Sequence, residues 1–260
     1  MTTRTLFNLT LALLAIGLLL IVYYKPGLET GNGQPPITAM EPEQITDIQV
    51  TRALREPLHF VKQAGAWLLA GPPELPASGF QVRSLLPLAQ ARAARSYPAG
   101  SLDPAALGLD PPQATITLNT TEIRIGTTDA LENKRYVQTG DMVYLIEDSY
   151  QHLINADWSN FVSRKLLPAG AGITRLQLPE LTLTRSIDDG WQITPDNPAS
   201  GADAVQQMIA AWQGASALYV RRYQAVDADE TIRITTDAAD PAITFKISSH
   251  TPEFILARPD

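Results

Sequence analysis

The sequence contains no cysteine among its 260 residues. This absence excludes disulfide bonds, thiolate metal sites, a cysteine nucleophile and the modified cysteine of a lipoprotein. It does not fix the redox compartment, because a cysteine-free chain is compatible with oxidising and reducing surroundings. The composition includes 45% hydrophobic residues, enough for one large domain or two small ones.

Histidine is scarce, and the familiar signatures of catalysis are missing. His59, His152 and His250 lie in different predicted elements without paired spacing, so the chain has no HExxH motif and no two-histidine helix face. We expect each histidine at the surface. The chain also has no GxSxG elbow, Walker loop, GxGxxG turn or EF-hand. We therefore predict no catalytic, cofactor-binding or metal-ligating residues, and a protein that is not an enzyme.

A long uncharged run lies near the N-terminus. Leu6–Tyr24 holds 19 residues without a charge, and about 20 apolar residues span a bilayer core. The sequence that follows has no small-x-small cleavage site, which favours an uncleaved anchor over residues 1–25. Comparing Arg4 with Lys25 weakly favours a cytoplasmic N-terminus. We predict a single-pass protein of the bacterial inner membrane with a periplasmic C-terminal domain.

Acidic residues dominate beyond this anchor. Without Arg4 and Lys25, 18 basic residues remain against 27 acidic ones. The chain has no lysine and arginine stripe that would neutralise phosphates, so we exclude nucleic acid as a partner. The acidic runs Asp227–Glu230 and Asp237–Asp240 are interpreted as solvated loops, with weak cation binding as the alternative.

The sequence repeats itself after a Gly/Pro-rich linker over residues 26–44. "ITDIQV" and "ITRLQL" open the two copies with alternating apolar residues. We predict a first unit over residues 45–168 and a second, incomplete unit over residues 173–260. The last residues, Phe254–Asp260, match Tyr136–Asp141 of the first copy, so either the second copy is shortened or it leaves an unpaired edge strand.

Each opener leads to a hairpin that ends on a tryptophan. The predicted turns are Ala64-Gly65 before Trp67 and Asp189-Gly190 before Trp191. A further hairpin in the first copy is expected to turn at Gly140-Asp141.

A helix is predicted after each of these tryptophan hairpins. The first covers residues 79–94, with Pro87 expected to kink it or to mark a late start. The second covers residues 202–218, with an amphipathic stripe and a cap from Ser200 or Asp203.

The end of the first copy predicts a third helix within residues 155–168, capped by Asp157. We interpret it as packing between the two copies, with partner docking as the alternative.

The stretch "LDPAALGLDPP" predicts a compact turn. Asp103 can cap a single helical turn that starts at Pro104 and ends at Gly108, after which Leu109 points into the core. Two alternating runs follow and should pair across Asn119-Thr120-Thr121. The functional alternative makes Asp103 and Asp110 metal ligands or an acid/base pair.

The ordered series "WLL", "LGLDPP", "ITL", "IRIG" and "RYVQTGDMVYLI" resembles the bacterial domain-of-unknown-function family 4340. The likeness covers residues 45–168 well and residues 173–260 more loosely, since the second copy lacks the Leu-Gly-Leu segment. The resemblance implies membrane-anchored extracytoplasmic proteins, some encoded beside gliding-motility-type ABC transporter components. It implies no catalytic residues.

These patterns predict an α+β protein: an N-terminal transmembrane helix, then two related units of twisted, mainly antiparallel sheet with one main helix each. We expect a non-catalytic accessory or scaffolding protein of an envelope or ABC-transporter-type complex. Its expected partners are the lipid bilayer, through Leu6–Tyr24, and envelope or transporter membrane proteins. The alternatives are a periplasmic glycan- or peptide-binding module and a carboxylate-based hydrolase.

Overall fold

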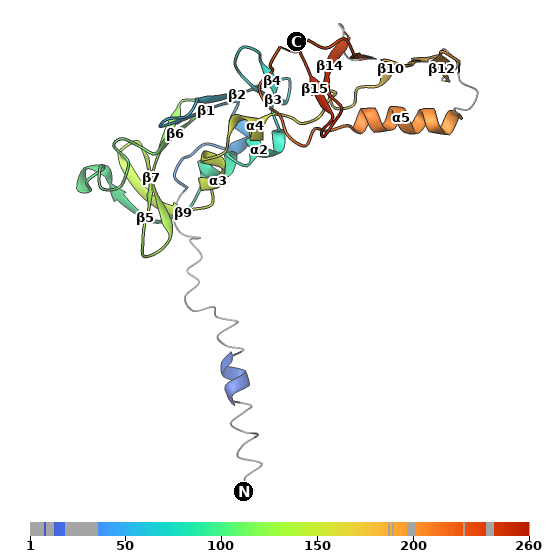
Figure 1. The fold of residues 1–260 in the computed structure, drawn as a ribbon. Helices are drawn as coiled ribbons and strands as arrows, with labels where there is room; N and C mark the ends of the chain where they lie inside the picture. Colours follow the sequence, from blue (N-terminus) through green and yellow to red (C-terminus); the bar gives the residue numbers. More distant parts are fainter. Residues whose placement is uncertain are drawn as a thin grey trace. The chain divides into compact units, whose positions relative to one another are not determined.

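Figure 1 shows a computed structural model of the chain. The structure describes residues 8, 13–18, 36–186, 188, 190–196, 201–225, 227–237 and 242–259. The chain divides into two compact units. Unit 1 comprises Met1–Ile45, Thr51–Arg55 and Leu86–Tyr150, and unit 2 comprises Thr46–Val50, Glu56–Leu85 and Gln151–Asp260.

Antiparallel strands dominate, and they form two sheets. The larger sheet has the strand order β4-β3-β2-β1-β6-β7-β8-β9-β5. Its strands in chain order are β1 (Asp47–Arg52), β2 (Leu58–Gln63), β3 (Ala66–Leu69), β4 (Leu75–Pro76), β5 (Ala93–Pro98), β6 (Ala114–Leu118), β7 (Thr121–Thr128), β8 (Lys134–Thr139) and β9 (Met142–Glu147).

The smaller sheet has the strand order β12-β11-β10-β13-β14-β15. Its strands are β10 (Ile173–Gln177), β11 (Thr182–Arg185), β12 (Trp191–Thr194), β13 (Thr231–Thr236), β14 (Ile243–Ser249) and β15 (Ile255–Ala257). This order repeats the order β3-β2-β1-β6-β7-β8 of the larger sheet. The expected α+β class, with two mainly antiparallel sheets, is confirmed.

The predicted hairpin turns of the first copy lie where left-handed backbone occurs. Ala64 and Gly65 both have positive φ between β2 and β3, and Gly140 has positive φ between β8 and β9. Asn119, also at positive φ, joins β6 to β7. In the second copy β11 and β12 form the expected hairpin, although Asp189 lies outside the described residues.

The described helices are mostly short. From residue 36 on they are α2 (Gly79–Arg83), α3 (Gln151–Ile154), α4 (Trp158–Phe161) and α5 (Ala202–Gly214), with 3₁₀ turns η1 (Pro42–Gln44), η2 (Leu86–Gln90) and η3 (Ala99–Ser101). With 13 residues, α5 is the longest of them. The prediction of one main helix per copy is therefore right for the second copy and wrong for the first.

The helix predicted over residues 79–94 is broken into three pieces. It ends as α2 at Arg83, continues as the 3₁₀ turn η2, and becomes strand β5 from Ala93. Pro87 lies inside η2 and has no N–H for a helical hydrogen bond, so the interruption expected there is confirmed. Pairing with β9 then decides the strand, although the alanines in this stretch favour a helix.

The helix predicted within residues 155–168 ends after one turn. Asp157 is the N-cap residue of α4, but its side chain makes no capping hydrogen bond. The chain after α4 bonds instead to strand β4 and to the residue that follows α5: Ser163 N donates to Pro76 O at 2.7 Å, and Leu166 N donates to Ala215 O at 3.2 Å. These backbone partners replace the helical ones.

The second predicted helix forms as α5 but is capped differently. Gly201 is its N-cap residue, and no side chain bonds to the first turn, so the predicted cap by Asp203 is wrong. Ser200 lies outside the described residues. Asp203 lies in the first turn, where a carboxylate suits the helix dipole.

Each unit has its own buried residues. In unit 2, α5 runs along one face of the smaller sheet (Figure 1) and places Val205 and Ile209 against it. Phe60 and Phe161 also pack in unit 2, with ring centroids 5.1 Å apart. In unit 1, fully buried residues of the sheet are Ile116, Leu118, Ile123, Ile125 and Val137.

The N-terminal anchor receives no support from the structure. Within the part of the chain that is described, no helix is long and apolar enough to cross a membrane. Most of Leu6–Tyr24 lies outside that part.

Candidate functional site

The Leu107-Gly108-Leu109 segment is packed onto strand β7. The Leu107 carbonyl accepts hydrogen bonds from the backbone N and the Oγ1 of Thr127, at 2.8 and 3.0 Å. A Cβ at Gly126 would lie 2.4 Å from the Leu107 oxygen. Gly108 has a φ of 63° and ends the turn as predicted, and Leu109 is fully buried. The segments "LGL" and "IRIG" are therefore in close backbone contact, and their glycines allow this approach.

Asp103 and Asp110 have separate surroundings. Asp103 Oδ1 accepts the Ala105 N–H at 3.1 Å, the capping role that the sequence predicts. Asp110 lines a hollow of about 120 Å³ together with Arg124 and Gln138. Ligand pockets usually hold roughly 300–1,000 Å³, so this hollow suits a few water molecules. The predicted alternative of an acid/base or metal pair gains no support.

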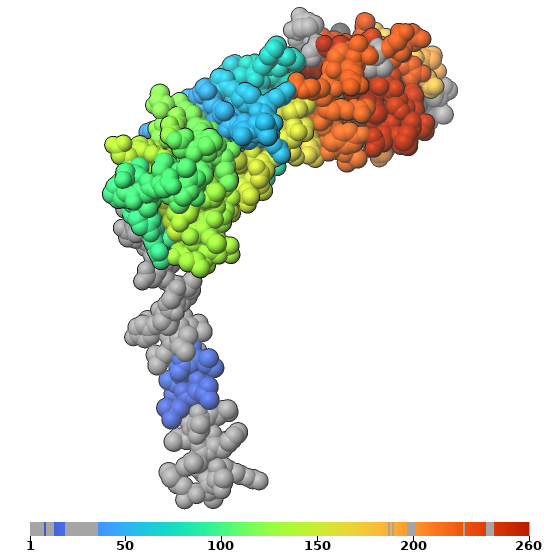
Figure 2. Space-filling model, turned by 60° about the vertical axis from the view of Figure 1, so that its left-hand side comes forward, coloured from blue at the N-terminus to red at the C-terminus, as the bar shows by residue number. Residues whose placement is uncertain are grey.

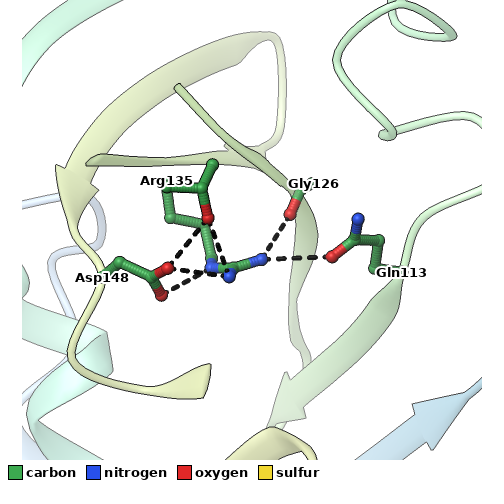
Figure 3. Close-up of polar contacts among 5 residues, drawn as sticks. Gln113, Gly126, Arg135 and Asp148 are labelled. Carbon is green, nitrogen blue, oxygen red and sulfur yellow. Dashed lines mark hydrogen bonds and ion pairs between the residues drawn. The ribbon is translucent and has the colours of Figure 1, made fainter. Parts of the chain in front are cut away.

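The most deeply buried polar cluster of unit 1 surrounds Arg135 (Figure 3). Arg135, on β8, donates from Nε and Nη2 to the two carboxylate oxygens of Asp148, at 2.7 and 2.8 Å. Its Nη1 donates to Gly126 O at 2.7 Å and to Gln113 Oε1 at 3.1 Å. Nη2 also donates to Thr128 Oγ1 at 3.0 Å. All five guanidinium N–H groups therefore have acceptors.

This cluster is a buried ion pair that stabilises the fold. The side chains of Arg135 and Asp148 are only 5% and 13% exposed. Hydrogen bonds from the guanidinium hold the pKa of Asp148 below its usual range, against the opposing effect of burial. Every N–H of the guanidinium is used by a protein acceptor, so none is left for a ligand. The role of the cluster is to join β7, β8 and the end of β9.

A second polar group lies at the loop before β8. Asp129 accepts the backbone N–H groups of Leu131 and Glu132, which lower the pKa of its carboxyl. Tyr136 donates its hydroxyl to Asp129 at 3.1 Å, and its own pKa is raised, first by burial. Arg95 pairs with Glu132 at 2.6 Å. These bonds fix the loop conformation.

The histidines do not come together. His59 Nε2 lies 2.7 Å from Asp47 Oδ2, and His250 Nε2 lies 2.8 Å from Glu230 Oε2. Both histidines are partly exposed, with 42% and 60% of the side chain accessible, as expected for surface residues. His152 lies apart from both, in α3. Among the described residues no three His, Asp or Glu side chains gather as metal ligands.

The acidic runs are only partly described. In the second run, Asp237 Oδ1 accepts the Gly172 N–H at 2.7 Å, and a Cβ at Gly172 would clash with that carboxylate. A hollow of about 290 Å³ lies nearby, lined by Pro168–Gly172, Lys165 and Gln213. It has no aromatic side chain on which a sugar could stack. The rest of this run, residues 238–240, lies outside the described residues.

An exposed aromatic surface lies in unit 2, on the chain that follows α5. We define the aromatic surface as Leu218, Tyr219, Tyr223 and Phe254, which are 85%, 48%, 46% and 53% exposed. Figure 2 shows the part of the chain that includes α5 and the residues after it (orange) beside the last strands (red). The Tyr219 hydroxyl donates to Glu253, which raises the pKa of Tyr219.

One arginine ties this chain segment to the rest of unit 2. The Arg222 guanidinium lies 5.3 Å from the ring centroid of Trp158 and pairs with Glu56. The segment is therefore held in place while its apolar side chains remain in solvent. Of the features described above, the aromatic surface is the one that leaves large apolar groups available to a partner.

The comparison with protein families gives one match. The model described as Domain of unknown function (DUF4340) matches residues 67–242, more than half of the chain. The chain belongs to the DUF4340 family. The match runs from β3 to just before β14 and so includes strands of both sheets. No curated protein and no solved structure matches this chain.

Two features of this DUF4340 chain escaped prediction from the sequence. Arg135 lies in β8, where the neighbouring residues give no sign that an arginine is buried. Asp148 lies just after β9 in a polar stretch, which gives no sign that it pairs with Arg135. The aromatic surface had one available signal, the run "LYVRRY", which interrupts an otherwise acidic half with aromatic and basic residues.

Proposed function

We propose that this DUF4340 protein is a non-catalytic accessory or scaffolding subunit of an envelope complex of the ABC-transporter type. It is anchored in the bacterial inner membrane through Leu6–Tyr24, with its N-terminus in the cytoplasm and its two sheets in the periplasm. The observation that carries the proposal is the aromatic surface, because exposed aromatic groups beside an arginine are typical of protein interfaces.

Charge and hydropathy support the location. The uncharged run of 19 residues has the length of a bilayer span, and the acidic remainder of the chain suits neither nucleic acid nor an anionic lipid surface. Contact with membrane partners would then come from protein surfaces.

The alternatives have weaker support. A carboxylate hydrolase needs two carboxyls with pKa values pushed apart, yet the shifts of Asp129 and Asp148 are both downward and both have structural causes. A glycan- or peptide-binding module would need a larger apolar pocket than the hollow beside Gly172.

The experiment is crosslinking in intact cells, followed by affinity purification of the anchored protein and mass spectrometry. The proposal expects recovery of a transporter permease or another envelope subunit, lost when the domain is released from its anchor. Recovery of nothing beyond an unrelated anchored protein would contradict it.

A pair of matched variants makes this test sharper. Leu218→Ser removes an exposed apolar side chain from the aromatic surface, and Leu131→Ser removes one that is equally exposed, at 93%, from a loop of unit 1. The proposal expects the first variant to reduce partner recovery and the second to leave it unchanged.

A further inference from the structure

Two stretches of this acidic chain contain no acidic residue. Residues 158–179 and 204–226 have no Asp or Glu, although the whole chain has 27 acidic residues against 20 basic ones. The basic residues within these stretches are Arg164, Lys165, Arg175, Arg221 and Arg222. Positive charge is therefore concentrated in two segments that are distant in the sequence.

The structure brings these two stretches together within unit 2. Ala217, just after α5, donates its backbone N–H to Arg164 O at 2.8 Å. Lys165 forms an antiparallel bridge with the neighbouring residue of the second stretch. Further along both segments, the Arg222 guanidinium lies 5.3 Å from the ring centroid of Trp158. The chain after α5 therefore runs antiparallel to the chain that begins with α4, and the basic residues of both lie on one part of unit 2.

Three of these cations have no acidic partner among the residues that the structure describes. Arg164, Lys165 and Arg221 are exposed, and none of their side chains forms an ion pair there. Arg222 differs, because it pairs with Glu56 and helps to hold the segment in place. The three exposed charges are therefore available to a ligand.

Uncharged side chains of the aromatic surface lie in the same segment. Leu218, Tyr219 and Tyr223 are exposed, and Arg221 lies between the two tyrosines in the sequence. Tyrosine and arginine are among the residues that contribute most to binding at protein interfaces. The segment therefore combines apolar contact area with positive charge over at most about 20 Å of chain.

We infer that this part of unit 2 binds an acidic segment of a partner protein. The residues that form this basic surface are Arg164, Lys165, Leu218, Tyr219, Arg221 and Tyr223. The inference deepens the proposed function and rests on it for the source of the segment. Charge complementarity carries the argument, because carboxylates of the partner would pair with cations that the protein itself leaves unpaired. Apolar side chains between those carboxylates would contact Leu218 and the two tyrosines.

An anionic lipid surface is the other ligand that positive charge attracts, and the composition of the basic surface favours a protein. Segments that bind acidic lipids usually carry clusters of about four to eight Lys or Arg residues. Here three unpaired cations alternate with large uncharged side chains, two of which bear hydroxyl groups. A protein segment with both carboxylates and apolar groups matches this mixture better than a layer of headgroups.

Peptide binding to the full chain in detergent tests this inference. The probe is a short fluorescent peptide in which Glu alternates with Leu and Tyr, and the control peptide has Gln at every Glu position. We expect the control peptide to bind at least about tenfold more weakly. Binding of the acidic peptide should also weaken as salt is added, because salt screens exposed charges. Equal binding of the two peptides, or no binding of the acidic one, would overturn the inference.

Matched variants locate the bound peptide. The double variant Arg164→Gln and Arg221→Gln removes two exposed charges that have no internal partner, so circular dichroism should show an unchanged fold. Arg233→Gln is the control, because Arg233 is an exposed arginine of β13 in the same unit. We expect the double variant to bind the acidic peptide at least about fivefold more weakly and the control variant to bind it like the wild type. Equal affinities of the two variants would place the peptide elsewhere and overturn the inference.

A soluble anionic lipid, dihexanoyl phosphatidylglycerol, distinguishes the two kinds of ligand. Saturable binding of this lipid that the double variant loses, together with no binding of the acidic peptide, would overturn the inference in favour of a membrane surface. Binding of the acidic peptide without binding of the lipid supports a protein partner.

The two proposals fail separately. If the acidic peptide does not bind but crosslinking still recovers an envelope subunit, the acidic ligand is wrong and the accessory role stands. If the peptide binds at the basic surface but crosslinking recovers no partner, the accessory role fails, and with it the envelope subunit as the source of the acidic segment.

Discussion

At the scale of single residues, unit 1 depends on one close backbone contact and one buried ion pair. The contact joins Leu107 to Gly126, and the ion pair joins Arg135 to Asp148. Both connect segments that are distant in the sequence. Substitutions at these positions should therefore affect stability much more than similar substitutions nearby.

The first prediction concerns Gly126→Ala. The new Cβ would meet the Leu107 oxygen at 2.4 Å, so the backbone of β7 or of the loop must shift. We expect a loss of about 1–3 kcal/mol in the free energy of unfolding. Thermal unfolding followed by circular dichroism measures it, with Gly100→Ala as the control because nothing lies within 4 Å of its Cβ position. Equal effects of the two variants would refute the contact.

The second prediction concerns Arg135→Met. It leaves the mostly buried Asp148 carboxylate without its partner, which typically costs about 3–5 kcal/mol. Arg124→Met is the matched control, because the pair of Arg124 with Glu122 is about half exposed and should contribute less than about 1 kcal/mol. Urea unfolding measures both, and circular dichroism is the better signal because the four tryptophans lie in unit 2.

The third prediction concerns pH. The pKa of Asp148 is lowered in the folded state, so its stabilising effect is complete above the unfolded pKa of about 3.9 and is lost as pH falls through the folded pKa. We expect the stability difference between the wild type and Asp148→Asn to shrink as the pH falls from about 5 toward 2. Urea titrations across this range provide the measurement. A difference that stays constant with pH would contradict the assigned charge.

At the scale of elements, α5 owes its position to its apolar stripe. Val205 and Ile209 are buried against the smaller sheet, while Met208 is 36% exposed and Trp212 packs at the edge of the cluster. The amphipathic pattern predicted this helix because its spacing is local. The broken helix over residues 79–94 shows the opposite case, where a proline and a strand partner outweigh the alanine-rich sequence.

The fourth prediction separates the two faces of α5. Ile209→Ala should cost about 2–5 kcal/mol because it leaves a cavity in the cluster. Met208→Ala, on the exposed side of the same helix, should cost less than about 1 kcal/mol. Tryptophan fluorescence during urea unfolding reports on this sheet through Trp191 and Trp212. Similar losses for both variants would show that α5 does not pack through the Ile209 face.

At the scale of the whole molecule, the repeated strand order is the main architectural finding. Six strands of the larger sheet recur in the same order in the smaller one, and the family match includes strands of both.

The fifth prediction concerns the anchor. Deleting residues 1–25 should move the protein from the membrane fraction to the soluble periplasmic fraction when a cleavable secretion signal replaces them. Cell fractionation with immunoblotting measures the distribution, and circular dichroism checks that the released chain is folded. A truncated protein that remains in the membrane fraction after a high-salt wash would contradict a role for this segment as the sole anchor.

The amino-acid sequence by itself determined the features that depend on neighbouring residues. Turns at Ala64-Gly65 and Gly140-Asp141, the alternation of β6 and β7, the capped turn at Asp103 and the stripe of α5 all follow from local backbone preferences and side-chain spacing. The family, too, was predicted from an ordered series of such motifs, and the match over residues 67–242 confirms it.

Only the tertiary structure decided the features that need a distant partner. Residues 93–98 are a strand because β9 pairs with them, although the alanines in this stretch favour a helix. The chain after α4 is extended because Pro76 and Ala215 supply its hydrogen bonds, and Arg135 is buried because four groups outside its own strand accept its protons. The physical reason is the same in each case: a backbone or charged group adopts the state in which its hydrogen bonds are satisfied, and those partners lie outside the segment itself.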